Sequence, residues 1–402
     1  MKTQVQIELP ESKSISNRLL ILQKLYGDKL RVEGLSTADD SKILESALHS
    51  SDKIINVGMA GTAYRFLTAY LAIAEGEKIL TGAERMCSRP IAPLVDALRS
   101  MKAEITYLEK NGFPPLKISG KKLKGGEVRI DANISSQFIS ALMLIAPKLP
   151  KGLQLHLSKE VVSEPYIDMT ADILKQCGVK LTSSSNSIEI QPMPQISAII
   201  QVEKDWSSAA FFYNLLCCMP APELSIHFPK LHLKSMQGDS ALPEIYAHLG
   251  VNTVETDIGL TICRDGSGSD KKVFDFSDTP DLLQPFLVSC AALNREVLIT
   301  GVETLRIKET DRILAMQKEL AKLGCSFVFR ESGLYQFIPT EKWPAELYVN
   351  TYNDHRMAMA FAALFKKIPK IQIEKPEVVS KSFPGFWQEM QKVGFPIRAL
   401  SE

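Results

Sequence analysis

The sequence lacks the short motifs by which many proteins bind nucleotides or metal ions. It contains no G-x-x-x-x-G-K-[ST] run, and no G-x-G-x-x-G run follows a strand-like segment. Its seven cysteines form an odd set with no C-x-x-C pair and no histidine at metal-ligand spacing. Nucleotide-driven chemistry and metal-dependent hydrolysis are therefore not expected, and we expect neither a cofactor nor a metal site.

Long apolar runs and an excess of charge of one sign are also missing. The longest mostly apolar runs, at residues 66–74 and 282–293, fall short of the roughly 20 residues that a membrane helix needs, and the opening Met-Lys-Thr-Gln carries no apolar signal core. Lys and Arg number 47 against 46 Asp and Glu, which gives a net charge of +1. We therefore expect a reduced, cytoplasmic protein without nucleic-acid or membrane partners, in which any cationic site is local.

What the sequence does contain is a long internal repeat, in which an amphipathic helix ends in glycine and runs into a strand. The copies recur at intervals of 70 to 76 residues, at Gly178, Gly250, Gly324 and Gly394, with Lys102 in the glycine place of a fifth copy and a weaker sixth copy at Gly27. The glycine supplies the left-handed turn that closes a helix. This period suits a compact α+β unit of several strands and two helices rather than a solenoid repeat. A chain of 402 residues is longer than a single hydrophobic core usually accommodates, so we expect two domains of three units each.

Small polar and cationic residues recur at the predicted helix starts of the first half. The stretch from Ser12 to Arg18 gathers hydroxyl groups, Lys13 and Arg18 at the head of one helix, where backbone N–H groups and the helix dipole favour anions. Similar heads are Gly61-Thr62 with Arg65, Ser88-Arg89-Pro90, Ser135-Ser136-Gln137 and Ser163-Glu164-Pro165-Tyr166. Helix capping or a solvated charge explains each head by itself, and only their recurrence favours an anion-binding site.

In the second half, two acidic residues join the cations at the helix starts. A helix-dipole partner or a surface ion pair explains each of them alone. Together, many cations with only two acids suit a pair of anionic substrates and proton transfer by carboxylates and a lysine. The residues are Asp281, Lys308, Glu309, Arg312, Arg356 in Asn-Asp-His-Arg, and Lys381.

The order of these motifs resembles that of the EPSP synthase family, the 3-phosphoshikimate 1-carboxyvinyltransferases. The resemblance runs from about Leu9 to Gly394 and includes Ser-Lys-Ser-x-Ser-Asn-Arg, Ala-Gly-Thr-Ala-x-Arg, Arg-Pro-Ile, Ser-Ser-Gln-Phe, Pro-Tyr-Ile-Asp, Gln-Gly-Asp, Lys-Glu-Thr-Asp-Arg and Asn-Asp-His-Arg-Met-Ala. It implies a mixed α/β (α+β) fold of two domains, each of three βαβαββ units arranged as an inside-out α/β barrel. The six units would form a six-fold pseudo-repeat, and a hinge that the chain crosses twice would join the two domains.

On this basis we expect an N-terminal domain of residues 12–236, mainly on the shikimate 3-phosphate side. The C-terminal domain would comprise residues 1–11 plus 237–402 and carry mainly the phosphoenolpyruvate side and the acid/base residues. The boundary is placed at the polar stretch Lys234–Asp239, between the third and fourth units.

The implied reaction transfers the enolpyruvyl group of phosphoenolpyruvate to the 5-hydroxyl of shikimate 3-phosphate, a step toward chorismate and the aromatic amino acids. Asp281 resembles the residue that accepts the hydroxyl proton, and Glu309 and Lys13 resemble candidates for protonating the methylene carbon. Domain closure would exclude water from the reaction. The two small molecules are the expected partners of a monomeric enzyme.

The resemblance also assigns binding residues position by position. Those that resemble the shikimate 3-phosphate site are Lys13, Ser14, Arg18, Ser135, Ser136, Gln137, Ser163, Tyr166, Asp281 and Lys308. Those that resemble the phosphoenolpyruvate site are Lys13, Gly61, Arg89, Gln137, Arg312, Arg356 and Lys381.

Two other functions stay open on the sequence. UDP-N-acetylglucosamine 1-carboxyvinyltransferases share fold and donor and use a loop cysteine, near which Cys87 lies, and a non-catalytic relative would only bind anions or a partner. The sequence also departs from the family's usual residues, with Met59 for Asn, Phe66 for Pro, Thr304 for Asn, and Asp281-Leu-Leu-Gln for Asp-Ala-Ala-Met. The first two are expected to border the phosphoenolpyruvate pocket, where the response to inhibitors such as glyphosate would differ.

Overall fold

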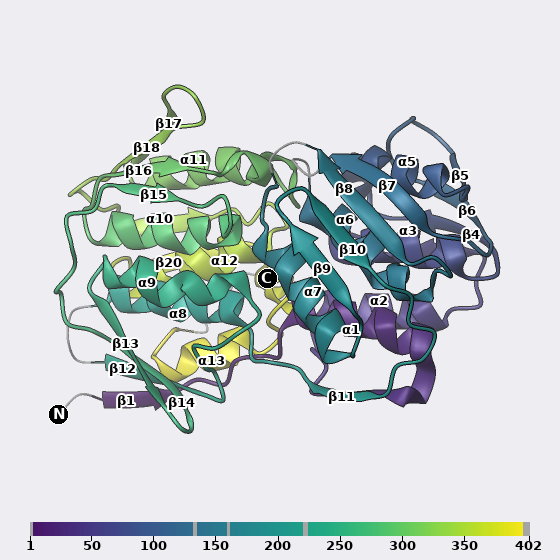
Figure 1. The fold of residues 1–402 in the computed structure, drawn as a ribbon. Coiled ribbons are helices and arrows are strands. Elements are labelled where there is room, and N and C mark those ends of the chain that lie inside the picture. The colour runs from purple at the N-terminus through teal and green to yellow at the C-terminus, as the bar shows by residue number, and fades with distance from the viewer. Residues whose placement is uncertain (1–2, 132–134, 159–160, 220–223, 397–402) are drawn as a thin grey trace. The chain divides into compact units, whose positions relative to one another are not determined.

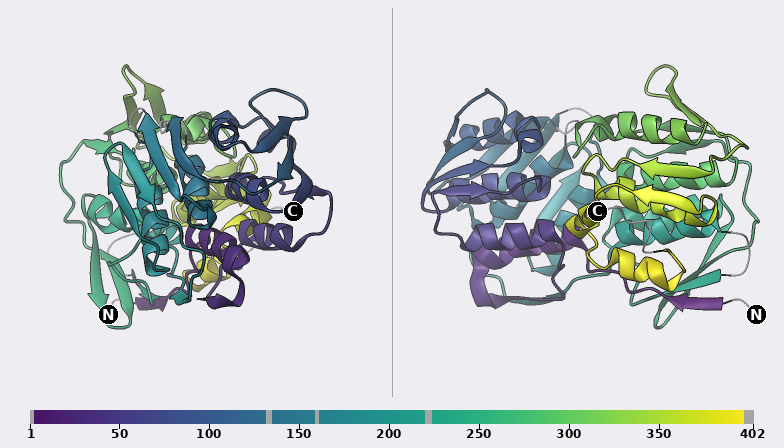
Figure 2. Two further views of the ribbon diagram at one scale, coloured as in Figure 1. Left: turned by 45° about the vertical axis from the view of Figure 1, so that its right-hand side comes forward. Right: turned by 180° about the vertical axis from the view of Figure 1, so that it is seen from behind.

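The computed structural model describes residues 3–131, 135–158, 161–219 and 224–396. The chain divides into two compact units, seen in Figure 1 and from two further directions in Figure 2. Unit 1 comprises residues 1–11 and 203–402, and unit 2 comprises residues 12–202.

The predicted boundary near residue 236 is therefore wrong by some thirty residues. Helix α8 (Trp206–Cys218) precedes that boundary but belongs to unit 1, where its apolar residues join the core of the C-terminal half. The stretch Lys234–Asp239 has the polar composition of a linker, yet its Gln237 side chain accepts a hydrogen bond from the backbone N–H of Trp206 at 3.0 Å. Composition by itself could not reveal this packing.

Unit 2 contains two four-stranded sheets, β3-β4-β6-β5 and β7-β8-β10-β9, and a two-stranded sheet, β11-β2. Its elements are α1 (Lys13–Tyr26), β2 (Leu30–Glu33), α2 (Asp39–His49), β3 (Ile54–Asn56), α3 (Gly61–Ile73), β4 (Gly76–Thr81), α4 (Glu84–Cys87), α5 (Ala92–Ser100), β5 (Glu104–Tyr107), β6 (Leu116–Gly120), β7 (Gly126–Asp131), α6 (Ser136–Ile145), β8 (Leu153–Ser158), α7 (Pro165–Gln176), β9 (Leu181–Ser184), β10 (Ser187–Ile190) and β11 (Ala198–Gln201).

Unit 1 has the corresponding sheets β1-β12-β14-β13, β15-β16-β18-β17 and β19-β20. Besides α8, its elements are β1 (Thr3–Gln6), β12 (Leu224–Pro229), η3 (Gly238–Ala241), α9 (Leu242–Ala247), β13 (Val251–Thr256), β14 (Gly259–Arg264), β15 (Val273–Asp275), η4 (Pro280–Leu282), α10 (Leu283–Ala292), β16 (Val297–Thr300), η5 (Glu303–Ile307), α11 (Arg312–Lys322), β17 (Ser326–Phe329), β18 (Tyr335–Ile338), β19 (Glu346–Val349), α12 (His355–Ala362), η6 (Ala363–Lys366), β20 (Lys370–Ile373), η7 (Pro376–Lys381) and α13 (Phe386–Lys392).

The four larger sheets share one topology, which confirms the mixed α/β class and the predicted repeat. In each, two parallel strands lie beside an antiparallel hairpin, as where β3 pairs in parallel with β4 and β4 pairs with β6 of the hairpin β5-β6. The remaining two copies of the repeat, which contain β2-β11 and β19-β20, have only a parallel pair of strands in the described part of the chain. The predicted βαβαββ pattern is thus complete in four of the six copies.

The chain passes between the units twice, after residue 11 and after residue 202. Strand β1 pairs with β12 of unit 1, whereas β11 pairs with β2 of unit 2, so each crossing follows a strand whose partner lies far away in the sequence. On the unit 1 side the two crossing segments are joined by a bridge between Glu11 and Lys204, whose side chains form an ion pair at 2.8 Å.

The repeated helix ends adopt the left-handed conformation that the sequence predicts. The φ angles are 75° at Lys102, 85° at Gly178, 78° at Gly250, 83° at Gly324 and 88° at Gly394. Residues 397–402, where a strand after Gly394 would continue, lie outside the described residues.

The sixth copy, at Gly27, follows the predicted order of helix, glycine and strand, but its strand pairs differently. Gly27 also has a positive φ, of 63°, but it ends α1, and the following strand β2 pairs in parallel with β11 rather than in a hairpin. A positive φ alone therefore does not identify the repeated unit.

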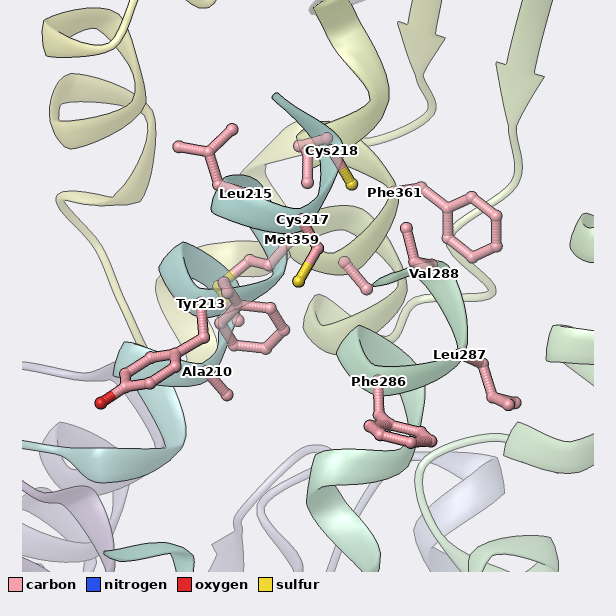
Figure 3. Close-up of a cluster of buried hydrophobic side chains, with 14 of the residues drawn as sticks. Ala210, Tyr213, Leu215, Cys217, Cys218, Phe286, Leu287, Val288, Met359 and Phe361 are labelled. Atoms are coloured by element: carbon pink, nitrogen blue, oxygen red, sulfur yellow. The ribbon is translucent and has the colours of Figure 1, made fainter. Parts of the chain in front are cut away.

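Three almost completely buried helices form the centre of unit 1. All ten residues of α10 and all eight of α12 are buried, and α8 is buried except at one position. Figure 3 shows side chains from these helices packed together, among them Phe286, Met359 and Cys217. A helix without an exposed face must be enclosed by other elements, and residues of all three helices belong to one hydrophobic core. Among the described residues, no helix is long and apolar enough to cross a membrane.

Lys102 provides a test of the repeat geometry. Because an ordinary side chain is strained at φ 75°, Lys102→Gly should raise the free energy of unfolding by about 1 kcal/mol, measured by chemical denaturation. Lys122→Gly, at an exposed residue without a positive φ, should lower it slightly instead. Equal effects of the two changes would contradict this account.

Candidate active site

In unit 2, the helix starts singled out by their sequence belong to helices that pack together. Helix α1 packs against α3, α6 and α7, and α6 packs against both α3 and α7. Ser12 caps α1 by accepting from the backbone N–H of Ile15, and Ser135 caps α6 by accepting from the N–H of Gln137 at 3.3 Å. The predicted residues of this unit are Lys13, Ser14, Arg18, Gly61, Arg89, Ser135, Ser136, Gln137, Ser163 and Tyr166.

Arg18 ties three of these helices together through neutral oxygens. Its Nε donates to Thr170 Oγ1 at 2.7 Å and its Nη1 to the carbonyl of Ser14 at 2.8 Å. Nη2 donates to the carbonyl of Tyr166 at 3.0 Å and to Ser140 Oγ at 3.2 Å. Burial among these uncharged groups lowers the pKa of Arg18 to about 10. No signal in the sequence pointed to Thr170 and Ser140, because a hydroxyl inside an apolar helix gives no functional signal.

Two further contacts place side chains at these helix starts. Lys13 Nζ lies 3.1 Å from Asp40 Oδ2, and both side chains are largely buried. Gln137 Nε2 donates to Thr62 Oγ1 at 3.1 Å, which joins the second residue of α6 to the second residue of α3. The Oε1 atom of Gln137 is buried and has no hydrogen-bond partner among the described residues. A buried amide oxygen of this kind is an acceptor for a ligand or a water.

Two arginine side chains lie close to Gly61. A Cβ atom at this position would lie 2.6 Å from Arg89 Nη1 and 2.8 Å from Arg65 Nη1, both below contact distance. The absence of a side chain at the first residue of α3 thus lets two guanidinium groups approach the helix start.

Ser163 has a backbone conformation that only a constrained site maintains. Its φ is 55°, in the left-handed region, and it is buried directly ahead of α7. Its carbonyl accepts from the N–H of Tyr166 at 3.1 Å. Such strain in a non-glycine residue is common at ligand-binding positions.

In unit 1, Arg312 is the centre of a cluster of ion pairs. Its side chain is 2% exposed and contacts Asp354 at 2.7 Å, Asp281 at 2.7 Å and Glu309 at 3.0 Å. Burial alone would lower the pKa of Arg312, but the carboxylates of Asp354, Glu309 and Asp281 outweigh it and raise the pKa above its ordinary value.

Asp281 is held ionised by its cationic neighbours. Arg356 Nη2 lies 3.0 Å from Asp281 Oδ2, and Arg356 Nη1 also donates to the Asp281 carbonyl at 3.0 Å. Lys308 Nζ lies 3.7 Å from Oδ1. Burial raises the pKa of Asp281, but Arg356, Lys308 and Arg312 together hold it well below the ordinary range of a carboxyl group.

The cluster is completed by an ion pair between Lys381 and Glu309 at 3.2 Å. All six predicted residues of unit 1 are thus joined by ion pairs: Asp281, Lys308, Glu309, Arg312, Arg356 and Lys381. Asp354, which the sequence motif contains but for which no role was predicted, caps α12 by accepting from the Arg356 N–H at 2.9 Å.

Asp239 is a second carboxyl group that the sequence analysis left without a role. It is buried, and Ser207 donates a hydrogen bond to its Oδ2, whereas Oδ1 has no partner among the described residues. Burial raises the pKa of Asp239 to about 6, with Arg356 acting in the opposite direction. Its Gln-Gly-Asp motif could have been a signal, but an aspartate beside glycine is also typical of a turn.

Some of the residues that depart from the family pattern are buried, whereas Met59 and Thr304 are partly exposed. Phe66 is 1% exposed, and its ring lies 5.5 Å from the guanidinium carbon of Arg18. Gln284 is fully buried on α10, and neither polar atom of its side chain has a partner among the described residues. The Thr304 hydroxyl is likewise buried without a described partner. In the described part of the chain, no group of three or more His, Cys, Asp or Glu side chains could hold a metal ion.

A model of the family described as EPSP synthase (3-phosphoshikimate 1-carboxyvinyltransferase) matches residues 2–390. The chain belongs to the EPSP synthase family. The 3-phosphoshikimate 1-carboxyvinyltransferase of Bacteroides fragilis strain YCH46 is 42% identical over 401 residues, which cover 98% of this chain and 97% of that protein. The protein of the same name from Photobacterium profundum is 34% identical, with 97% and 96% covered.

Solved EPSP synthase structures have the same fold. The 2.37 Å structure of EPSP synthase from Acinetobacter baumannii superposes with a TM-score of 0.74 at 20% identity, covering 98% of this chain and 96% of that one. At this identity the likeness concerns the fold.

Asp239 makes the stability of this EPSP synthase family member depend on pH. Because its pKa of about 6 in the folded state exceeds the ordinary 3.8, the folded protein binds the proton more tightly than the unfolded chain, and stability falls as pH rises from about 4 to about 6. The Asp239→Asn variant has no carboxyl group at this position, so its stability does not fall in this way as pH rises. The variant should therefore gain roughly 2 to 3 kcal/mol relative to the wild type across that interval, measured by denaturation at several pH values. A constant difference between the two proteins would contradict the raised pKa.

Proposed function

We propose that this protein transfers the enolpyruvyl group of phosphoenolpyruvate to the 5-hydroxyl of shikimate 3-phosphate, giving 5-enolpyruvylshikimate 3-phosphate and inorganic phosphate. The observation that carries the proposal is the cluster of unit 1, in which the carboxylates of Asp281 and Glu309 are held by four cations in a chain of the EPSP synthase family. The ion-pair cluster contains both cationic groups that can bind anions and carboxylates that can exchange protons.

Shikimate 3-phosphate is assigned mainly to the helix starts of unit 2. Lys13 and Arg18 supply positive charge there, the hydroxyl groups of the serines supply hydrogen bonds, and Tyr166 lies at the edge of the site. Arg18 suits an anionic ligand because all its described hydrogen-bond acceptors are neutral, so its charge is not offset by a bonded carboxylate. The proposed ligands are Lys13, Ser14, Arg18, Ser135, Ser136, Gln137, Ser163, Tyr166, Asp281 and Lys308.

Phosphoenolpyruvate carries a phosphate and a carboxylate and requires several cations. Arg312 and Arg356, which both hold Asp281, are assigned to this substrate. Arg89 is assigned to it as well, because Gly61 leaves room for the Arg89 guanidinium group at the start of α3. Arginine forks match the planar carboxylate and the phosphate oxygens. The proposed ligands are Lys13, Gly61, Arg89, Gln137, Arg312, Arg356 and Lys381.

The reaction proceeds by addition and then elimination. The 5-hydroxyl oxygen bonds to C2 of phosphoenolpyruvate while Asp281 takes the hydroxyl proton and Glu309 or Lys13 protonates C3. In the second step C3 gives up a proton, the double bond re-forms, and the bond between C2 and the phosphate oxygen breaks. The cations hold the phosphate as negative charge develops on it.

Substrate binding and the basicity of Asp281 are coupled in this scheme. Arg312 and Arg356 hold the pKa of Asp281 down, and the same two side chains are assigned to the phosphoenolpyruvate anion. As the anion attracts the guanidinium groups, Asp281 loses compensating charge. Burial then raises its pKa, and the carboxylate becomes a stronger base when a substrate is present.

The setting of the enzyme follows from the same proposal. The protein acts as a cytoplasmic monomer in aromatic amino acid biosynthesis, with phosphoenolpyruvate and shikimate 3-phosphate as its partners and without nucleic acid. The near-balanced charge and the reduced cysteines support this setting.

The decisive experiment measures phosphate release from phosphoenolpyruvate in the presence of a chelator, with either shikimate 3-phosphate or UDP-N-acetylglucosamine as acceptor. Release only with shikimate 3-phosphate supports the proposal. Release only with the nucleotide sugar would assign the chain to the other enolpyruvyl transferase activity. Calorimetric binding of both substrates without release would indicate a binding protein.

Asp281→Asn tests the proposed base. The amide keeps the size of the side chain but cannot accept the hydroxyl proton, so kcat should fall by about 10² or more while both KM values change by about threefold or less. Steady-state kinetics measure both quantities, and Asp275→Asn in the same unit serves as the control. Near-normal turnover would remove Asp281 from this role.

Gly61→Ala tests the phosphoenolpyruvate site. The added methyl group displaces the Arg89 guanidinium, so KM for phosphoenolpyruvate should rise about tenfold while KM for shikimate 3-phosphate stays within about twofold. Gly385→Ala is the matched control, because a Cβ there meets only Phe383 at 3.8 Å. A change confined to KM for shikimate 3-phosphate would contradict the assignment of Gly61 and Arg89.

A further inference from the structure

The turn that leads into α12 contains two consecutive strained residues. Tyr352 and Asn353 have φ angles of 54° and 55°, both in the left-handed region. Asparagine tolerates this conformation, but a bulky aromatic residue rarely adopts it. Asp354 follows this turn directly, and Arg356 lies two residues further on. The strained turn therefore sets the positions of two members of the ion-pair cluster.

One buried carboxylate binds this turn at two points. Glu319 is fully buried on α11, and its Oε1 accepts from the Tyr352 hydroxyl at 2.7 Å. Its Oε2 accepts from the backbone N–H of Asn350 at 3.1 Å and from Lys322 Nζ at 2.6 Å. Backbone strain persists only where the surroundings impose it. Glu319 helps to impose it here, together with Glu374, which accepts from the Thr351 N–H at 3.0 Å, and Lys375, which donates to Asn353 Oδ1 at 3.2 Å.

The same helix also holds the other end of the turn. Arg312 begins α11 and contacts Asp354, and Glu319 follows seven residues later on the buried stripe of that helix. Residues seven apart lie two turns along one face of a helix. The turn from Asn350 to Asp354 is therefore fixed at both ends by α11.

We propose that Glu319 is a positioning residue, which acts through Tyr352 to orient Asp354 and Arg356 for phosphoenolpyruvate. This inference rests on the proposed function, in which Arg356 binds that substrate. Glu319 does not contact the substrate; it holds the turn from which the Arg356 guanidinium reaches Asp281. Loosening the turn would change the direction of Arg356 without removing any charge from the cluster itself.

The internal repeat supplies a matched control. Glu389 lies 70 residues after Glu319, at the same place of the next repeat, and is also buried on its helix. It accepts from the backbone N–H of Glu8 at 2.9 Å and pairs with Lys392 at 2.7 Å. Among the described residues, no tyrosine hydroxyl donates a hydrogen bond to Glu389. Glu8, whose N–H donates to Glu389, has no positive φ. The two glutamates thus differ mainly in the strained turn.

The test compares Glu319→Gln and Tyr352→Phe with two controls, Glu389→Gln and Tyr213→Phe. Tyr213 is a buried tyrosine of the same unit whose hydroxyl lies 2.8 Å from Thr253 Oγ1, so the second control removes a comparable hydrogen bond. In each test variant, KM for phosphoenolpyruvate should rise about tenfold while KM for shikimate 3-phosphate stays within about twofold. The controls should lower Tm by similar amounts without changing either KM.

The double variant Glu319→Gln with Tyr352→Phe adds a second criterion. Because Tyr352 and Glu319 act as one unit, the double variant should raise KM for phosphoenolpyruvate no further than Glu319→Gln alone. Multiplicative effects of the two changes would overturn the proposed route through Tyr352. If Glu319→Gln does not fold, Tyr352→Phe alone decides, since it removes a single hydroxyl group.

Amide hydrogen exchange separates this inference from the proposed function. In Tyr352→Phe the amides of residues 354–356 should exchange about tenfold faster than in the wild type, and Tyr213→Phe should leave them unchanged. If the wild type shows no turnover but these amides respond, the proposed function fails, whereas the structural part of the inference, that Glu319 and Tyr352 hold this turn, is supported. If the wild type turns over and neither KM nor exchange changes, Glu319 has no positioning role.

Discussion

The burial of Arg312 is the constraint on which the organisation of unit 1 depends. A guanidinium group inside a protein is costly unless it is paired, and here three carboxylates contact it: Glu309 from just before the same helix, and Asp281 and Asp354 from elsewhere in the chain. Meeting this requirement brings together the starts of α10, α11 and α12. The cluster is thus a structural requirement of the fold and a source of proton-transferring groups at the same time.

The two units treat their buried arginines in opposite ways. Arg18 in unit 2 is bonded only to neutral oxygens among the described residues, and its pKa falls to about 10, whereas the carboxylates around Arg312 raise the pKa of that arginine. An anion that approaches Arg18 gains an interaction without displacing a bonded carboxylate. An anion that approaches Arg312 must compete with Asp281 and Glu309, and this competition is what can change the basicity of Asp281 on substrate binding.

Much of the fold could be predicted from the sequence, because the repeated helix ends require a left-handed residue. That requirement identified four glycines correctly and also Lys102, although lysine gives no left-handed signal by itself. At Gly27 a glycine with positive φ also closes a helix ahead of a strand, but that strand pairs in parallel with β11. The requirement gave no domain boundary, because the crossing after residue 202 depends on whether α8 packs with the core of unit 1, which is a tertiary contact.

For the site, the sequence by itself determined which chemical groups stand at the helix starts, since caps, prolines and cations occur at characteristic places within a helix. It could not determine their partners. That Asp354 lies against Arg312, that Glu319 holds the strained turn at Tyr352, and that Asp239 is buried with a raised pKa are all decided by contacts between segments far apart in the chain. The physical reason is that a side chain's charge, hydrogen bonds and pKa depend on what surrounds it, and only the folded chain assembles those surroundings.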